Sequence, residues 1–423
     1  MRHTIQQKGS RMWYSIVMAG IIEAVCLPAA LADQDDHAYA GKQPNIILFF
    51  VDDLGWADLG YRNPVFESPN IDRLAREGID FEQAYTVSPT CSPSRAALLT
   101  GQYPTRFQVV RHVPSGHRKL GFDKFGRTDR EFNYWPNNPV QIPSRNWLPL
   151  DSTTYAESLK NQGYYSMFVG KWHLGDEAYY PVKQGFDQET GVSNFGLPDS
   201  YYPPYLKNAT IFAEEKERYL TDKLTDEAVK FIETYDREKP FMLTFWHYSV
   251  HAPHEGRKDL VSHFEAKGLT GEFAHYAAMV KAMDESVGRV REAIEKKGLA
   301  EDTIVVLLSD QGGYFDNAPF YGSKRCDALY EGGTRIPFIF YWPGNSKAGK
   351  NNSIVQSIDL FPTLIEIAGG NVAGFKDLDG ISLVSAIREN SMLERSEPIY
   401  VYHAYVDLYA SVRLGDWKLI AYR

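Results

Sequence analysis

The chain has 423 residues and a formal net charge of −9, and its 43% hydrophobic content is that of a globular protein. A chain of this length can bury a core without disulfide staples, so its three cysteines do not mark a disulfide scaffold. The negative charge argues against nucleic acid as a partner.

The first 32 residues are predicted to be a signal peptide. An apolar stretch ends in Ala30-Leu31-Ala32, and it is preceded by the basic residues Arg2, Lys8 and Arg11. Because Glu23 interrupts the apolar stretch, an uncleaved membrane anchor is the alternative. No later segment has the composition of a membrane span. We therefore expect a secreted protein, periplasmic or extracellular, with no membrane attachment after cleavage.

Apolar runs rich in β-branched and aromatic residues predict buried strands, and amphipathic segments between them predict helices. The predicted strands cover residues 45–51, 163–170, 241–247, 303–309 and 336–342. The predicted helices cover residues 69–77, a run that starts just after Cys91, and residues 154–162, 221–235 and 273–297. This alternation is typical of an α/β domain with a mostly parallel sheet flanked by helices.

The tail has a different pattern. PIYVYHA and YASVRLGDWKLIAY predict antiparallel strands. We therefore expect a catalytic α/β domain over residues 33–375 and a small, abbreviated antiparallel subdomain over residues 376–423.

Residues 105–150 lack periodicity and combine basic with aromatic side chains. These are Arg106, Arg111, Arg118, Lys119, Arg127, Arg130, Phe132, Tyr134 and Trp135. Such a segment can bind substrate, with aromatic rings stacked on sugar faces and arginines on sulfates, or it can merely cover the sheet. The candidate substrate contacts are Arg111, His112, His117 and His254.

Three carboxylates follow predicted buried strands. Asp52 and Asp53 come after the first strand, and Asp310 comes after the strand at 303–309, with Gln311 next to it. Open α/β sheets bind ligands at these strand ends. Helix capping or pairing with arginine is the alternative. If the three acids gather, they need a cation, and oxygen donors favour Ca²⁺ or Mg²⁺ over zinc.

Cationic side chains follow the same pattern. Lys171 and His173 alternate after a predicted strand, His251 follows another, and Lys324 lies in the loop after Asp310. Each alone is more often a surface or packed residue. Together with Arg95 and the helix start at Cys91 they predict a pocket for a small tetrahedral oxyanion.

The motifs described so far leave the role of Cys91 open. It could form one disulfide with Cys326, pack as a small apolar residue, or act chemically.

Several motifs resemble those of the formylglycine-dependent (type I) sulfatases of the alkaline-phosphatase superfamily. Cys91-Ser92-Pro93-Ser94-Arg95 matches the family pattern Cys-x-Pro-x-Arg, followed by AALLTG. The run from Gly163 to His173 matches a second signature. NIILFFVDDLGWADLG, SDQGG and YEGGTRIP match three further blocks, so the resemblance extends from Asn45 to Trp417. It implies an alkaline-phosphatase-like fold.

The resemblance also implies that a formylglycine-generating or equivalent maturation enzyme oxidises Cys91 to Cα-formylglycine. Oxygen atoms of modified Cys91 and of four other residues would then bind Ca²⁺, with Mg²⁺ less expected. Those four residues are Asp52, Asp53, Asp310 and Gln311.

The remaining implied roles concern the hydrated aldehyde and the sulfate. Arg95 would orient the formylglycine and His173 would hydrogen-bond its second hydroxyl. One hydroxyl would attack sulfur, and His173 would take a proton from the other so that sulfate leaves. The sulfate-binding and leaving-group positions match Lys171, His251 and Lys324.

The sequence departs from the family pattern at two site positions. Gln311 stands where Asn or His is usual, which moves its oxygen by one methylene. The loop from Lys324 to Tyr330 is longer than usual, and the family spacing counted along the chain would reach Cys326.

The sequence therefore predicts a sulfatase that acts on a sulfated carbohydrate. Two alternatives stay open: a phosphonate or phosphate ester hydrolase with the same motif, and a carbohydrate-binding pseudo-sulfatase if Cys91 is not converted.

Overall fold

The structure is a computed structural model that describes residues 42–114, 131–133, 143–206, 211–404 and 409–421. All of them belong to one compact unit, Ala38–Arg423. The predicted signal peptide and several residues of the 105–150 segment lie outside the described residues, namely His117, Arg118, Lys119, Arg127, Arg130, Tyr134 and Trp135.

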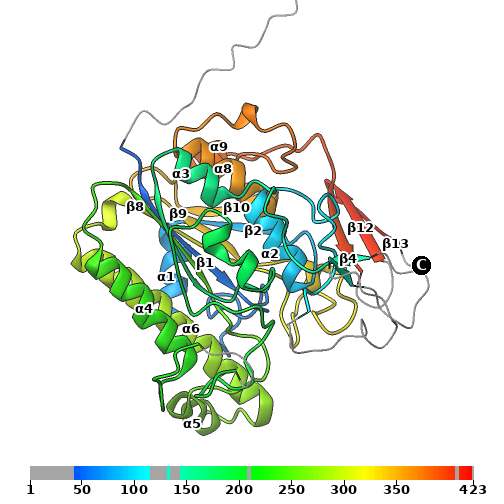
Figure 1. The fold of residues 1–423 in the computed structure, drawn as a ribbon. Coiled ribbons are helices and arrows are strands. Elements are labelled where there is room, and N and C mark those ends of the chain that lie inside the picture. The colour runs from blue at the N-terminus through cyan, green and yellow to red at the C-terminus, as the bar shows by residue number, and fades with distance from the viewer. Residues whose placement is uncertain (1–41, 115–130, 134–142, 207–210, 405–408, 422–423) are drawn as a thin grey trace, which may run out of the picture. The chain divides into compact units, whose positions relative to one another are not determined.

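An eight-stranded sheet forms the centre of this unit (Figure 1). In spatial order its strands are β10 (Gly349–Gln356), β2 (Ile79–Tyr85), β9 (Phe338–Tyr341), β8 (Thr303–Ser309), β1 (Asn45–Val51), β7 (Phe241–Trp246), β5 (Tyr165–Gly170) and β6 (Gln188–Thr190). Only β9 runs antiparallel to its neighbours, so the predicted mostly parallel sheet is confirmed.

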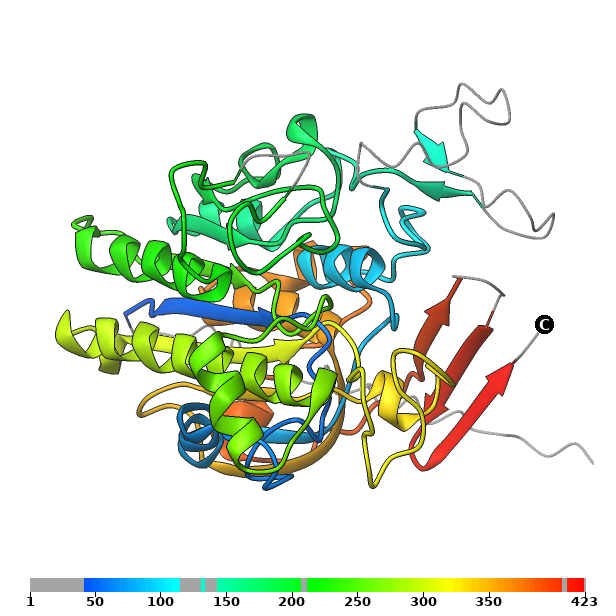
Figure 2. The same ribbon diagram turned by 90° about the horizontal axis from the view of Figure 1, so that it is seen from below.

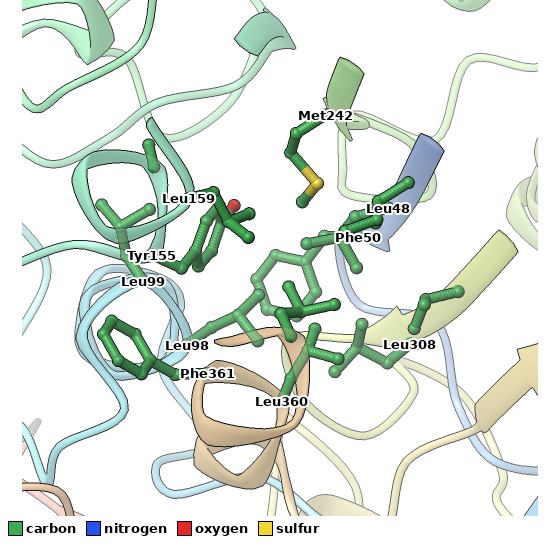
Figure 3. Close-up of a cluster of buried hydrophobic side chains, with 14 of the residues drawn as sticks. Leu48, Phe50, Leu98, Leu99, Tyr155, Leu159, Met242, Leu308, Leu360 and Phe361 are labelled. Carbon is green, nitrogen blue, oxygen red and sulfur yellow. The ribbon is translucent and has the colours of Figure 1, made fainter. Parts of the chain in front are cut away.

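Helices cover both faces of the sheet because successive residues of a strand point to opposite sides. Leu48 and Phe50 of β1 pack against one group of helices (Figure 3). That group consists of α2 (Cys91–Thr100), α3 (Tyr155–Asn161), α8 (Leu360–Ile367) and α9 (Val384–Glu389). Ile47 and Phe49 face the other group, which consists of α1 (Pro69–Glu77), α4 (Leu220–Thr234), α5 (Lys258–Ala266) and α6 (Gly271–Lys296).

A small antiparallel sheet follows at the C-terminal end of the chain, as predicted (Figure 2). Its strands are β11 (Ile399–His403), β12 (Tyr409–Leu414) and β13 (Trp417–Ala421). Arg413 and Lys418 form ion pairs with Glu331 of the short helix α7 (Glu331–Thr334), which joins this sheet to the larger body. The domain boundary at residue 376 stays a prediction.

Most predicted elements lie within a few residues of the observed ones, and the strands at 45–51 and 303–309 match to the residue. The prediction at Cys91 was off by one position, because α2 begins at Cys91 itself with Thr90 as its N-cap residue. The predicted elements do not include β2, β10, α5, α8 or α9. Within the described residues, no helix combines the length and apolar composition needed to cross a membrane.

Only two short strands interrupt the described part of the 105–150 segment. These are β3 (Phe132–Asn133) and β4 (Ser144–Arg145), which pair with each other.

Candidate active site

The predicted site residues meet where four parallel strands end. β1 leads to Asp52 and Asp53, β8 to Asp310, and β5 to Lys171, while β7 leads towards His251. The order β8-β1-β7-β5 makes these strands immediate neighbours, so their carboxyl ends share one edge of the sheet. The N-terminus of α2, with Cys91, contacts the same edge, because the Cys91 Sγ lies 3.5 Å from Asp52 Oδ1.

The three carboxylates are fully buried and close together. Asp52, Asp53 and Asp310 have no exposed surface. The backbone N–H of Asp53 donates to Asp310 Oδ1 at 3.0 Å, which joins the loops after β1 and β8. Burial, reinforced by the negative charges of Asp52 and Cys91, raises the pKa of Asp310 well above its usual value. Carboxylates in this situation require a cation or a proton.

Part of this cluster has the composition of a metal site. Possible ligand atoms of Asp52, Asp53, Cys91 and His251 all lie within 4.8 Å of one another. Asp310 is adjacent to this group rather than part of it, since its Oδ2 faces Arg95 at 3.2 Å. Buried carboxylate oxygens at this spacing suit a hard cation such as Ca²⁺.

Gln311 supplies a further test of that fit. Its Nε2 donates to Asp53 Oδ1 at 2.5 Å and faces the Cys91 Sγ at 3.3 Å. Its Oε1 is buried and has no hydrogen-bond partner among the described residues. Half a turn of the amide would exchange the two atoms and direct an oxygen at the cluster. The residues present therefore fit a bound cation.

Cys91 is a buried free thiol, 1% exposed, at the first position of α2. Cys326 is also free, so the possibility of a disulfide between them is wrong. Burial alone would raise the pKa of the Cys91 thiol, but Lys171 and Lys324 lower it well below its usual value. The side chain at this position is thus held in a strongly positive field.

Arg95 connects the acidic and basic halves of the cluster. Its buried guanidinium donates to the carbonyl oxygen of Lys171 at 3.0 Å and to Asp310 Oδ2 at 3.2 Å. The same group lies over the rings of Phe50 and Trp246, about 5 Å from each centroid. Its nearest hydrogen-bond partners are therefore Lys171 and Asp310, and it approaches Asp52 at 3.6 Å.

Two lysines reach the carboxylates. The ammonium group of Lys171 contacts Asp52, and Lys324 Nζ lies 2.5 Å from Asp53 Oδ2. Burial would lower the pKa of Lys324, but the negative charge of Asp53 raises it well above the usual value. Cys326, which the family spacing would reach, is exposed and contacts Ser323 at 3.6 Å. The structure thus directs Lys324 into the cluster.

His173 lies beside Cys91 as a neutral ring. Its Nε2 is 2.9 Å from the carbonyl oxygen of Val113, and its buried Nδ1 has no hydrogen-bond partner in the described part of the chain. Burial lowers its pKa to about 4. The ring also packs tightly against Gly196, where an added Cβ would lie 2.5 Å from His173 Cε1.

Two residues of the cluster have left-handed backbone conformations. The φ angle is +61° at Asp53 and +59° at His173. Residues other than glycine adopt this conformation at a cost, and such residues concentrate at functional sites.

The remaining candidates occupy different environments. His251 Nε2 lies 3.7 Å from Asp53 Oδ2, and its Nδ1 is 2.7 Å from the carbonyl of Ala252. The His254 side chain is fully buried, with Nδ1 2.8 Å from Glu272 Oε1. Arg111 is 3% exposed, and His112 stacks on His173. Arg106 from the same segment forms an ion pair with Asp379, which occupies its guanidinium.

Ser92 is a residue that sequence reasoning missed. Its hydroxyl donates to the carbonyl oxygen of His173 and accepts from the backbone N–H of Val113, both at 2.9 Å. It thereby ties α2 to two segments that flank Cys91. Ser92 occupies a variable position of the Cys-x-Pro-x-Arg motif, so the sequence carries no signal for this role.

Comparisons with known proteins agree on one family. Residues 44–370 match the Sulfatase family model, and residues 320–423 match the model described as N-sulphoglucosamine sulphohydrolase, C-terminal. N-acetylgalactosamine-6-sulfatase of Homo sapiens is 32% identical over 403 residues, covering 90% of this chain and 72% of the relative. A sulfatase of Formosa agariphila is 32% identical over 480 residues, covering 96% and 82%.

Solved structures show the same relationship. Ps i-CgsB, solved in complex with k-i-k-neocarrahexaose, superposes with a TM-score of 0.74 at 31% identity, covering 90% of this chain and 84% of that one.

Proposed function

The chain belongs to the sulfatase family of sulfuric ester hydrolases, and from this premise we propose that it removes sulfate from sulfated carbohydrates with a formylglycine derived from Cys91 and a bound Ca²⁺. One observation carries the catalytic part. Cys91 is a buried free thiol at the start of α2, between oxygen donors for a cation and a group of positive charges.

The proposed Ca²⁺ ligands are side-chain oxygens of Asp52, Asp53, Asp310 and Gln311, together with an oxygen of modified Cys91. Ca²⁺ bound there would offset the buried negative charge and polarise the S–O bonds of the sulfate. Mg²⁺ suits this group less well, because it demands near-ideal octahedral geometry.

Lys171 and Lys324 are proposed to bind the sulfate oxygens. Their ammonium groups lie at the carboxylates of Asp52 and Asp53, so a sulfate beside the cluster is within reach of both. Charge-assisted hydrogen bonds of this kind are shorter and stronger than neutral ones. Arg95 holds the backbone of Lys171 and the carboxylate of Asp310 in position through its hydrogen bonds to them.

Two histidines are proposed to move protons. A hydrated aldehyde at residue 91 offers one hydroxyl to attack sulfur and a second hydroxyl whose proton must leave before sulfate can be expelled. Nδ1 of His173 suits that second proton, because Nε2 is committed to the Val113 carbonyl. His251, near Asp53, or Lys324 is proposed to protonate the departing alcohol oxygen.

The carbohydrate substrate is supported by the relatives. One is named for N-acetylgalactosamine 6-sulfate, and Ps i-CgsB was solved with a carrahexaose. Secretion after removal of residues 1–32, and conversion of Cys91 by a maturation enzyme, belong to the same proposal.

Mass spectrometry of the peptide that contains Cys91 tests the central claim. We expect a mass about 18 Da below that of the cysteine peptide, together with turnover of nitrophenyl sulfate. Cys91→Ala should abolish turnover and leave the fold intact, because the side chain is small. Retained activity in that variant would refute the nucleophile. An unmodified thiol without activity would favour a carbohydrate-binding protein, and a strong preference for phosphate esters would favour a phosphate hydrolase.

A further inference from the structure

Tyr276 of α6 contacts the backbone of a proposed calcium ligand. Its side chain is buried, and its hydroxyl lies 3.2 Å from the carbonyl oxygen of Asp53 and 2.5 Å from Asp58 Oδ2. A tyrosine hydroxyl has one proton, and a proton shared between two acceptors forms a three-centre hydrogen bond. Tyr276 therefore connects the long helix on one face of the sheet to the loop after β1, although no step of the proposed chemistry uses it.

The Asp58 carboxylate contacts both loops that carry proposed calcium ligands. Asp58 is 1% exposed, and its Oδ2 accepts from the N–H of Gly55 at 2.7 Å, in the loop after β1. Gly313, in the loop after β8, lies against the same oxygen, because an added Cβ there would be 2.6 Å from it. Only glycine allows the backbone to come this close. One buried oxygen thus joins the loops after β1 and β8.

The Tyr276 ring is held in place by other aromatic rings. Phe66 packs edge-on against it at a centroid distance of 5.9 Å, and Phe315, in the segment after β8, does so at 4.9 Å. A side chain that is enclosed in this way has one position available to its hydroxyl before any ligand binds. The hydrogen bonds of Tyr276 are therefore part of the fold and do not depend on the ligand.

Asp53 is the ligand whose backbone depends on these contacts. Its φ angle of +61° is left-handed, a conformation that persists only where the surroundings enforce it. Its N–H donates to Asp310 Oδ1 at 3.0 Å, and its carbonyl oxygen faces the Tyr276 hydroxyl. Loss of that hydroxyl would remove one of these two contacts of the Asp53 backbone.

From this arrangement we propose that Tyr276 and Asp58 are positioning residues of the calcium site, which hold the backbone of Asp53 so that its carboxylate points at the other ligands. This inference rests on the proposed function, because it takes the acidic cluster as the calcium site. Both residues act through the backbone of Asp53 rather than by contact with the ion. A site whose ligands are already in place binds its ion more tightly, because less ordering is needed on binding.

Tyr276→Phe provides the test, because phenylalanine keeps the ring and its packing but lacks the hydroxyl. Ca²⁺ binding to the chelator-treated full chain is measured by calorimetry, at a temperature well below the melting temperature of every protein compared. We expect the Kd for Ca²⁺ to rise about tenfold or more, the effect of losing one buried hydrogen bond that the bound state needs.

Tyr164→Phe is the matched control. Tyr164 is 2% exposed, and its hydroxyl donates to the carbonyl oxygen of Pro44 at 2.8 Å, at the other end of β1. Both variants lose a buried tyrosine hydroxyl, so both should melt at a lower temperature, but only Tyr276→Phe should bind Ca²⁺ more weakly. A Kd of Tyr276→Phe within about threefold of wild type, or an equal rise in both variants, would overturn the proposal.

If Tyr276→Phe does not fold, Asp58→Ala and Asp58→Asn take its place. Both remove the negative charge, and only asparagine keeps an oxygen that can accept from the Tyr276 hydroxyl. Ca²⁺ should therefore bind about tenfold more weakly to Asp58→Ala than to Asp58→Asn, and equal Kd values would overturn the proposal.

If the wild-type protein binds no Ca²⁺, the proposed function fails instead. Hydrogen exchange of the backbone over residues 51–60, measured by mass spectrometry, then decides the inference. Faster exchange in Tyr276→Phe than in Tyr164→Phe would support the positioning role, and equal exchange would overturn it.

Discussion

His173 Nε2 donates a hydrogen bond to the carbonyl oxygen of Val113 at 2.9 Å. A carbonyl oxygen can only accept, so this contact fixes the proton on Nε2 and leaves the lone pair on Nδ1. The tautomer of a histidine beside Cys91 is therefore set by the backbone of the segment after α2, and no carboxylate is needed for it.

Replacement of His173 should remove the proton acceptor. In His173→Gln the amide can still donate to Val113, but it has no basic nitrogen. We expect kcat for nitrophenyl sulfate to fall by about 100-fold or more, the usual contribution of a general base. The variant should melt within a few degrees of wild type. A kcat within tenfold of wild type would refute the proposed role.

Ser92→Ala should weaken both the fold and the site. It removes the bond to the His173 carbonyl and leaves the N–H of Val113 buried without a partner. We expect the free energy of unfolding to fall by about 1–3 kcal/mol, as measured by urea denaturation. The kcat should fall as well, because His173 and Val113 lose their common anchor.

Ser262→Ala is the matched control for that experiment, because Ser262 lies on α5 and, among the described residues, its hydroxyl bonds within its own helix, to the carbonyl of Lys258. Ser262→Ala should change neither the free energy of unfolding nor kcat measurably. If Ser92→Ala behaved like this control, Ser92 would not be the anchor described above.

Calcium should stabilise the protein through Gln311. Adding Ca²⁺ at about 100 times its Kd to chelator-treated protein should raise the free energy of unfolding by about 2.7 kcal/mol. Gln311→Leu, of similar volume, should weaken Ca²⁺ binding at least tenfold in calorimetry. Unchanged affinity in this variant would show that the amide oxygen does not bind the ion.

Glu331 should make stability depend on pH below about 4.5. Burial alone would raise the pKa of its carboxyl, but Lys418 and Arg335, with hydrogen bonds from Lys418 and Tyr85, lower it to about 2. A carboxyl whose pKa is lowered by folding stabilises the folded state fully when the pH is above the pKa that the group has in the unfolded chain. This contribution is lost as the pH falls towards 2, the pKa in the folded state. Burial lowers the pKa of Lys418, which offsets part of the gain.

We therefore expect Glu331→Gln to lower the free energy of unfolding by about 1–2 kcal/mol at pH 7, less than the full shift implies, because the carboxyl is 24% exposed. The difference between wild type and variant in urea denaturation should shrink between pH 4.5 and pH 2.5. A constant difference over that range would contradict the assignment. Glu292→Gln, on the exposed face of α6, should show no measurable effect at either pH.

The sequence predicted those parts of the fold that are apolar throughout. The strands at 45–51 and 303–309 are buried along their whole length, and their short apolar runs rich in β-branched and aromatic or leucine residues favour strands. β2 and β10 were missed because their sequences, IDFEQAY and GKNNSIVQ, contain polar residues in the middle. Their pairing partners, which make them strands, are distant in the chain.

In the candidate site, too, some contacts could be predicted from the sequence and others could not. Asp52, Asp53 and Asp310 could be predicted to meet, because parallel strands end at one edge. The contacts of Ser92 and His112 could not, because they depend on how the 105–150 segment returns to α2. Lys324 was ambiguous by counting along the chain; its contact with Asp53 favours it over Cys326, and its role stays a prediction.

The burial of Cys91 has a consequence for the order of events during synthesis. The residue is 1% exposed, and its helix is packed between the sheet and its neighbours from the first turn onward. Once α2 has packed against the sheet, an enzyme could not bind the backbone around Cys91. If a maturation enzyme oxidises this thiol, as proposed, it would have to act before the helix docks, and a chain that folds first would stay correctly folded and inactive.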